Sequence, residues 1–196
     1  MRDIKRIFVH CTAGSQKQTK NDLLREFKAK GWSAPGYHYV VFPDGRVDSL
    51  LTEDKVSNGV QGFNSTAINI AYVGGIDSKG RATDNRTEAQ KEALRSKLTE
   101  LKKKYPNAHI MGHRDIWGKN PANWKKQCPC FDAEKEYENI LEINDKIQAL
   151  EDENKMLKAQ AHAQMLTSLP LFAQPEEPKQ SIWSKVKSYF PWTKKN

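Results

Sequence analysis

Three side chains that can bind a metal ion are spread along the sequence. His10 ends an apolar run, His113 lies in Gly-His-Arg-Asp at 112–115, and Cys128 lies in Lys-Gln-Cys-Pro-Cys-Phe-Asp at 126–132. Neutral imidazole nitrogen and thiolate sulfur are zinc ligands, and a tetrahedral site with three protein ligands leaves the fourth position for water. Together the three residues indicate a catalytic zinc site, at which a hydrolysis could take place.

An ordinary structural role is the alternative for each of these residues. No two of them stand at zinc-finger spacing. A free cysteine often packs as a small buried hydrophobic residue, and a histidine often forms hydrogen bonds inside a fold. The zinc interpretation therefore depends on secondary structure that brings three distant positions together.

Short β-rich segments and two amphipathic segments predict an α/β fold, with a mixed central β-sheet covered by helices and a C-terminal helical extension. The strands are expected at residues 4–10, 37–42, 46–51, 67–73 and 108–111, and the helices at 19–30 and 87–105. Ligand sites gather at strand ends and in loops, and His10, His113 and Cys128 all occupy such places. Because side chains alternate along a strand, Cys11 should face the core if His10 faces a cleft.

Composition narrows the class of protein. The chain has 196 residues, three cysteines and a formal net charge of +8. An odd number of cysteines, two of them separated by one proline, favours metal binding or burial over a disulfide framework. Most of the positive charge lies in residues 1–132, which suits nucleic acid, an anionic membrane or an anionic polymer. The sequence has neither a run of the roughly 20 apolar residues that cross a bilayer nor a signal peptide, so we expect a cytoplasmic chain at synthesis.

After residue 135 the sequence changes character. Residues 136–168 predict a charge-rich helical segment, with apolar residues at heptad positions a and d within 140–161 and Asn154 at one a position. A homodimeric coiled coil is one interpretation, because a lone Asn at an a position fixes the register of a parallel dimer. A single helix that lays its apolar stripe on the domain is the other.

The C-terminal end has two further parts. Residues 169–180 contain Pro170, Pro175 and Pro178 and predict a Pro-rich linker. Residues 181–196 predict a basic amphipathic tail, with large apolar residues at helical spacing and flanking lysines. Such a tail suits contact with an anionic membrane through residues 181–195, and docking on the domain or on a partner is the alternative.

Five motifs in residues 4–135 resemble those of the zinc N-acetylmuramoyl-L-alanine amidases of the phage-lysozyme and peptidoglycan-recognition-protein superfamily. They are Phe-Val-His-Cys-Thr-Ala at 8–13, Gly-Tyr-His-Tyr at 36–39 followed by Asp-Gly at 44–45, Tyr-Val-Gly-Gly-Ile-Asp at 72–77, and the two segments around His113 and Cys128. Five motifs in the family's order are hard to obtain by chance. We therefore expect a zinc amidase catalytic domain in residues 1–135.

The resemblance implies a role for particular residues. It makes His10, His113 and Cys128 the Zn²⁺ ligands, and it implies a catalytic Tyr37 and a catalytic Lys126. Cys130 falls at a variable position of its motif and His38 is expected to be a structural neighbour. The implied reaction is hydrolysis of the amide between N-acetylmuramic acid and the L-alanine of the stem peptide, with zinc activating water and with Tyr37 and Lys126 stabilising the oxyanion.

The resemblance also implies that the protein acts on the peptidoglycan of the cell wall, and no specific nucleic acid is expected. Two departures from the family pattern stand out. Phage lysozymes often have a second His before a Gly-Tyr/Phe-Asn stretch, and residues 57–64 contain none, which bears on a secondary substrate contact. The loop at 115–124 is longer than in the short phage enzyme, and its Trp117 and Trp124 either stack on sugars or pack under the loop.

Two other classes of function are compatible with the resemblance. A non-catalytic peptidoglycan-binding module is one, but such members have usually lost zinc ligands, whereas all three are present here. A polymerase-regulating partner is the other.

Overall fold

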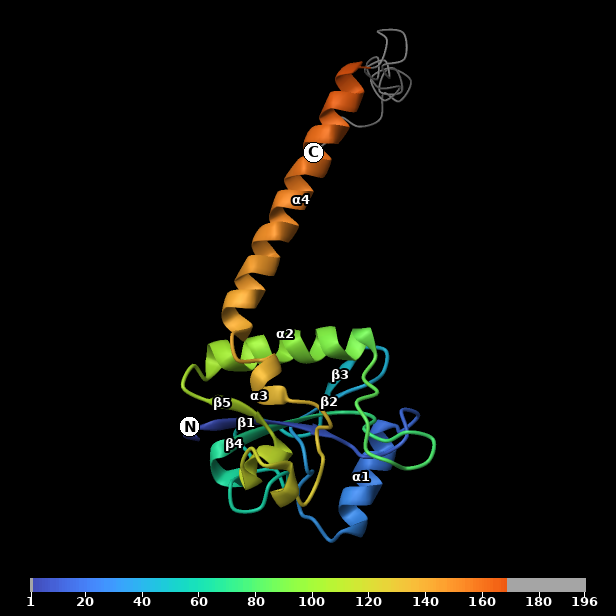
Figure 1. Ribbon diagram of the computed structural model, residues 1–196, viewed down its shortest axis with the longest axis vertical. Helices are drawn as coiled ribbons and strands as arrows, with labels where there is room; N and C mark the ends of the chain where they lie inside the picture. Colours follow the sequence, from blue (N-terminus) through green and yellow to red (C-terminus); the bar gives the residue numbers. More distant parts are fainter. Residues whose placement is uncertain (1, 169–196) are drawn as a thin grey trace, which may run out of the picture. The chain divides into compact units, whose positions relative to one another are not determined.

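A five-stranded mixed sheet forms the centre of the first of two units, between which the boundary lies after Lys146. The computed structural model describes residues 2–168. The strands are β1 (Arg6–Cys11), β2 (Tyr39–Val41), β3 (Val47–Ser49), β4 (Ala67–Tyr72) and β5 (His109–Gly112). Their order is β3-β2-β4-β1-β5, and only the β2–β3 pair is antiparallel (Figure 1). The predicted mixed α/β fold is therefore confirmed.

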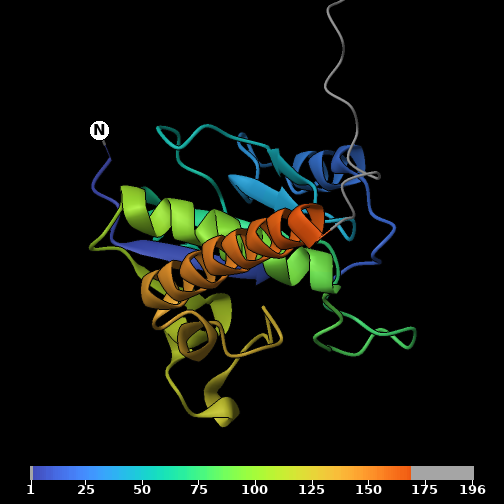
Figure 2. The same cartoon turned by 90° about the horizontal axis from the view of Figure 1, so that it is seen from above.

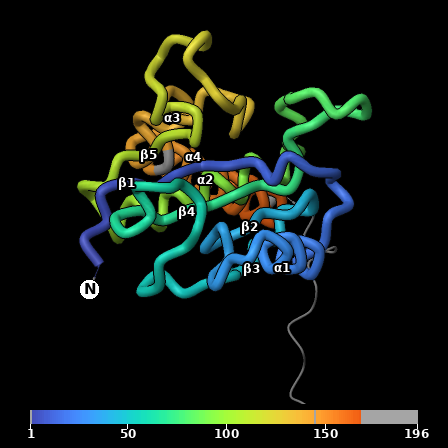
Figure 3. The backbone as a smooth tube through the Cα atoms, turned by 90° about the horizontal axis from the view of Figure 1, so that it is seen from below, coloured from blue at the N-terminus to red at the C-terminus, as the bar shows by residue number. Residues whose placement is uncertain are grey.

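The two faces of the sheet carry separate apolar clusters. Ile7, Val9 and Ile70 face α2 (Glu88–Lys104) and pack with its Leu94 and Leu98. Figure 2 shows α2 lying across the sheet. On the other face, α1 (Lys20–Ala29) lies beside β2, as Figure 3 shows from the opposite side, and its buried residues pack against that strand. Because both faces are covered, the central strands β1 and β4 are nearly continuous runs of buried residues.

Both main helices are preceded by a threonine that caps the first turn. Thr87 caps α2 and forms a capping box with Gln90, and Thr19 does the same for α1 with Asp22. In such a box the two side chains satisfy backbone N–H groups that the first helical turn leaves without partners. The amide of Gln90 also donates to the carbonyl oxygens of Val41 and Val73, so this cap joins the helix to the sheet.

The chain then continues into short and long helices. The short ones are the 3-10 helices Asn64–Thr66, His113–Trp117 and Pro121–Asn123 and the helix α3 (Ala133–Glu136). The long helix α4 spans Ile140–Ser168, so the predicted C-terminal helix is present but begins four residues later than position 136. Tyr137 and Ile140 are buried in the same core as Phe131.

Within residues 2–168, no helix combines the length and the apolar character that a membrane span requires. The predicted linker at 169–180 and the predicted tail at 181–196 lie outside the described residues.

Candidate metal centre and active site

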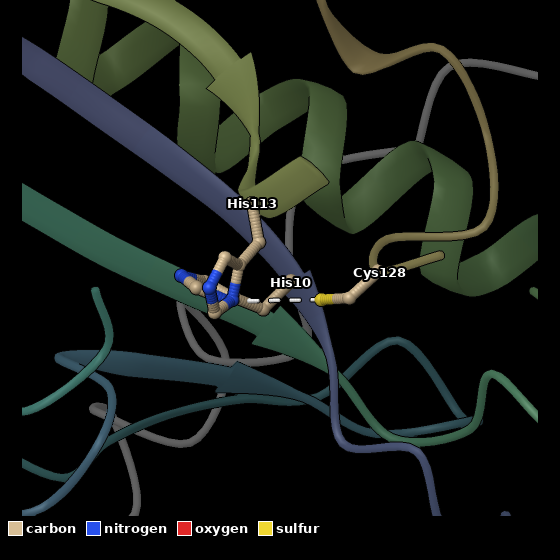
Figure 4. A group of neighbouring side chains, drawn as sticks. All are labelled: His10, His113 and Cys128. Carbon is tan, nitrogen blue, oxygen red and sulfur yellow. Dashed lines mark hydrogen bonds between the residues drawn. The ribbon is translucent and has the colours of Figure 1, made fainter. Parts of the chain in front are cut away.

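Sheet topology brings the two histidines together. β1 and β5 are adjacent and parallel, with Val9 opposite Gly112. Their carboxyl ends therefore meet at one edge of the sheet, where His10 is the next residue of β1 and His113 follows β5. Cys128 reaches the same place from the loop that precedes α3. Figure 4 shows the three side chains pointing toward one another from these separate segments.

The three ligand atoms form a compact group. His10 Nδ1 lies 3.2 Å from His113 Nδ1 and 3.7 Å from Cys128 Sγ, and all three atoms lie within 4.8 Å of one another. His10 is almost fully buried, with 1% of its surface exposed, whereas His113 and Cys128 are partly exposed. The structure therefore forms the metal-binding group that the sequence predicts.

The protonation of the histidines suits metal binding. Burial lowers the pKa of His10 to about 4, with the positive charge of Lys126 acting in the same direction and the hydrogen bond with Asn69 opposing it. Burial, together with His10 and Lys126, lowers the pKa of His113 to about 3. Both imidazoles are consequently neutral at pH 7, which is the state that binds a metal ion.

Behind His10 lies a buried polar network that the sequence analysis missed. His10 Nε2 is 2.8 Å from Asn69 Oδ1, and Asn69 Nδ2 is 2.8 Å from Ser57 Oγ. His38, the expected structural neighbour, belongs to this network through its contacts with Ser57 and with the backbone N–H of Asn69. One signal was available: Asn69 is the only polar amide in the otherwise apolar strand β4, and a buried polar group requires partners.

A cavity of about 240 Å³ opens beside the metal-binding group. Tyr37 and Lys126 both line it, so the structure places the two predicted catalytic residues next to the three predicted ligands. The Tyr37 ring centroid lies 5.2 Å from that of His10, and burial raises the pKa of its hydroxyl above the ordinary value. The hydroxyl therefore stays protonated and can donate a hydrogen bond.

The same cavity has an aromatic wall. Phe27 and Trp32 line it, and their rings are stacked with centroids 5.6 Å apart. A larger cavity of about 480 Å³ lies elsewhere, bordered by Lys102, His109 and Glu134. It contains none of the predicted site residues, so the chemistry of the lining, and not the volume, identifies the candidate site.

The other two cysteines lie on the core side of the metal-binding group. Cys11 is buried in the core, as expected from the alternation along β1. Cys130 Sγ lies 3.8 Å from Cys11 Sγ and 3.4 Å from the carbonyl oxygen of Gly75. The backbone N–H of Cys11 lies 3.2 Å from Cys128 Sγ and donates to it. This hydrogen bond joins the Cys128 sulfur to the end of β1, beside His10.

The rings of the two tryptophans in the long loop pack on the two residues that precede it. Trp117 stacks on His113 with ring centroids 5.6 Å apart. Trp124 holds the guanidinium of Arg114 at 4.1 Å from its ring centroid and donates from Nε1 to the carbonyl oxygen of Gly118. These contacts favour the packing interpretation, and the Trp117 ring also supports one face of His113.

Comparison with known proteins agrees with this geometry. Residues 1–131 match the sequence profile of the N-acetylmuramoyl-L-alanine amidase family. An endolysin of Klebsiella phage KP32 is 40% identical over 141 residues, which cover 70% of this chain and 87% of that protein.

Solved structures of other proteins share this fold. The Ph2119 endolysin from the Thermus scotoductus MAT2119 bacteriophage is 31% identical with a TM-score of 0.54, covering 66% of this chain and 79% of that one. The ectodomain complex of peptidoglycan recognition proteins LCa and LCx with tracheal cytotoxin shares the fold at 22% identity, with a TM-score of 0.55 and coverage of 71% and 83%. The chain therefore belongs to the N-acetylmuramoyl-L-alanine amidase family.

Proposed function

We propose that this protein is an endolysin that uses a zinc ion held by His10, His113 and Cys128 to cleave the amide between N-acetylmuramic acid and L-alanine in peptidoglycan. Amidase activity follows from membership of the family. The observation that carries the catalytic proposal is the presence of two imidazoles and one thiol in a compact group beside an open cavity.

Two of the three separations between the donor atoms, both measured from His10, fit zinc. Tetrahedral bonds of about 2.0–2.1 Å to nitrogen and about 2.3 Å to sulfur correspond to separations of about 3.3 Å between two nitrogen ligands and about 3.6 Å between nitrogen and sulfur. The observed separations from His10 Nδ1 are 3.2 Å to His113 Nδ1 and 3.7 Å to Cys128 Sγ. Magnesium and calcium prefer oxygen ligands, so the donor set also favours zinc.

Bound zinc would supply a water molecule of lowered pKa and would polarise the scissile carbonyl. The chain itself would stabilise the negative charge that develops on the carbonyl oxygen during attack. Tyr37 offers a protonated hydroxyl in the cavity wall and Lys126 offers an ammonium group at the same cavity. Hydrogen-bond donors aimed at a developing oxyanion are among the strongest contributions to such reactions, and we propose this role for both residues.

The reaction is tested on purified cell-wall sacculi, with mass spectrometry of the soluble products and metal analysis of the protein. We expect peptides with a free L-alanine amino group, glycan strands with intact lactyl groups, and bound zinc. A protein that binds zinc and sacculi but releases no peptide would be a binding module and would overturn the catalytic proposal.

For helix α4 we propose a parallel homodimer through residues 140–161, with the seam beginning at Ile143 because Ile140 is buried in the core of the first unit. Leu150 and Leu157, both at d positions, are 64% and 57% exposed, and Ile143 at the preceding d position is also exposed. Asn154 stands at an a position between them, where it would fix the register. Sedimentation of the full chain and of a Leu150→Lys, Leu157→Lys variant tests this: a dimer that becomes a monomer supports the proposal, and a monomeric wild type contradicts it.

A contact between residues 181–195 and anionic membranes is a further proposal that rests on the sequence pattern alone, since these residues lie outside the described part of the chain. Co-sedimentation with anionic vesicles should decrease when residues 180–196 are deleted. Equal binding to vesicles by the full chain and by the truncated chain would contradict the proposed membrane contact.

A further inference from the structure

The side of His10 that faces away from the cavity is held by a single amide. Asn69 is fully buried on β4, the strand next to β1. Its Oδ1 lies 2.8 Å from Nε2 of His10, while Nδ1 of the same ring faces His113 and Cys128. The two ring nitrogens of His10 are thus directed to two different partners, an amide on one side and the metal-binding group on the other.

The surrounding hydrogen bonds fix which atom of the amide faces His10. The backbone N–H of Asn69 donates to Nδ1 of His38 at 3.0 Å, so that nitrogen carries no proton. Ser57 Oγ lies 3.2 Å from the same nitrogen, and its hydroxyl can only donate there. Ser57 Oγ therefore accepts from Asn69 Nδ2 at 2.8 Å, which leaves Oδ1 as the atom directed at His10.

An amide oxygen can only accept a hydrogen bond. Nε2 of His10 must therefore carry the ring proton, and Nδ1 is left with its lone pair directed at His113 and Cys128. In metal sites, the hydrogen bond made by one ring nitrogen sets which nitrogen binds the ion. The network built from Asn69, Ser57 and His38 supplies that hydrogen bond here.

Gly59 leaves the space that the amide occupies. A Cβ atom at this position would lie 2.3 Å from Asn69 Oδ1, 2.4 Å from Asn69 Cγ and 2.8 Å from the carbonyl oxygen of Gly36. Real Cβ atoms essentially never approach other atoms so closely. Any side chain at 59 would displace the amide from His10, so the glycine and the asparagine form one unit.

We propose that Asn69 is the positioning residue of the metal centre: its amide oxygen holds His10 in the tautomer and orientation that present Nδ1 to the ion, and Gly59 is required for this contact. The inference rests on the proposed metal function, but the tautomer of His10 is a property of the metal-free protein as well. The position of the proton can therefore be measured without the ion.

The test compares Asn69→Leu, which removes the acceptor at similar volume, with Asn69→Asp, which keeps an acceptor. Thr99→Val serves as the control, because it removes another buried hydroxyl that bonds only within α2. Zinc affinity is measured by competition with a chromogenic chelator. The protonated ring nitrogen of His10 is identified from ¹H–¹⁵N correlations of the imidazole in the metal-free protein.

We expect Asn69→Leu to weaken zinc binding about 10-fold to 100-fold and to lose the single Nε2-protonated form of His10. Asn69→Asp gives up the hydrogen bond donated to Ser57 but keeps an acceptor for His10, so it should retain the Nε2-protonated form. Thr99→Val should retain both properties. Wild-type zinc affinity and an unchanged tautomer in Asn69→Leu would overturn the proposal. If that variant does not fold, a His10 without a proton on Nε2 in Asn69→Asp, or wild-type properties in Gly59→Ala, would overturn it equally well.

The proposed function can fail separately from this inference. A wild-type protein that binds no zinc would contradict the proposed metal function. The tautomer of His10 in wild type and in Asn69→Leu would still decide whether Asn69 positions the ring.

Discussion

Two polar clusters are buried in the first unit, and they differ in charge and in whether they are closed. The cluster behind His10 is built from the neutral side chains of Asn69, Ser57 and His38, with Arg2 3.3 Å from the outer nitrogen of His38, and it leaves the Nδ1 lone pair of His10 for the metal-binding group. The cluster around Arg86 is ionic: its guanidinium, with a side chain only 2% exposed, forms hydrogen bonds with Asp84, Glu136 and Tyr137 and stacks on Phe131.

The five N–H donors of Arg86 are matched by five short contacts with these partners. Burial alone would lower the pKa of Arg86, but the hydrogen bonds with Asp84 and Glu136 raise it, so the cluster is charged and complete. The difference teaches that a buried polar cluster indicates a ligand site when it leaves a donor atom directed outward, and a structural tie when it closes on itself.

The largest effect is expected from replacing a metal ligand, which should abolish both zinc binding and activity. Cys128→Ser should abolish zinc binding and reduce amidase activity to background, because a hydroxyl is a poor substitute for a thiolate as a zinc ligand. Cys130→Ser should keep most of both, since its sulfur lies beside Cys11 on the core side. Metal analysis and sacculus digestion of the two variants check this, and zinc loss confined to Cys130→Ser would refute the assigned ligand set.

Removing a hydrogen-bond donor that lines the cavity should lower turnover without loss of the zinc ion. Tyr37→Phe and Lys126→Ala should each retain zinc but lose about 10²-fold to 10³-fold in turnover, the usual cost of losing one oxyanion donor. Turnover and zinc content are measured on the same preparation. Near-normal turnover in both variants would remove these residues from the mechanism.

Replacing Arg86 in the ionic cluster should lower the stability of the fold and leave zinc binding unchanged. We expect Arg86→Met to lower the free energy of unfolding by about 2–4 kcal/mol, somewhat less than breaking a fully buried pair costs, because Asp84 and Glu136 are partly exposed. Denaturant titration measures the change, and zinc affinity of the folded variant should equal that of wild type.

The matched control for Arg86 is Arg81→Met, which breaks an exposed pair with Asp77 and should change the free energy of unfolding by about 1 kcal/mol or less. Equal destabilisation by Arg86→Met and Arg81→Met would show that the buried cluster stabilises the fold no more than an exposed ion pair does.

A smaller loss of stability is expected at low pH from Glu53 and the side chains that donate to it. Burial alone would raise the pKa of Glu53, but hydrogen bonds from Lys104, Tyr105 and Tyr39 lower it from the ordinary 4.5 to about 2. A carboxylate with a depressed folded-state pKa stabilises the fold above its unfolded pKa, and this contribution is lost as the pH falls from about 4.5 through about 2. We expect the loss to reach about 1–2 kcal/mol after allowance for solvent screening.

Unfolding at a series of pH values measures this loss, with Glu53→Gln as the control. The variant should be less stable than wild type at pH 7 and should have a flatter dependence on pH between about 4.5 and 2. Parallel curves for the two proteins would contradict the role of Glu53.

Sequence reasoning located the metal-binding group because strand ends are visible in the sequence. His10 and His113 terminate β-rich segments, and parallel strands place their carboxyl ends at one edge. The sequence did not reveal which strands are adjacent, and the assignment of Tyr37 and Lys126 depended on the resemblance to a family. Their position in one cavity is tertiary information.

The buried hydrogen bonds between distant parts of the chain were harder to predict. The hydrogen bond between His10 and Asn69 joins residues 59 positions apart, and the pair formed by Arg86 and Glu136 spans 50 positions. No local periodicity encodes such pairings. The predicted heptads begin at Ile140, which is the first residue of α4, but the sequence did not reveal that this residue is buried in the core of the first unit.

The strand order has a consequence for the synthesis of this protein. β1 is made first, yet it lies between β4 and β5, which emerge from the ribosome much later. His10 must wait for a partner 103 residues further along the chain, and Cys128 follows later still. Pairing between such distant segments is slow relative to local folding. An incomplete nascent chain thus lacks the metal-binding group, and the capacity to hydrolyse the wall arises only when nearly all of the domain has been made.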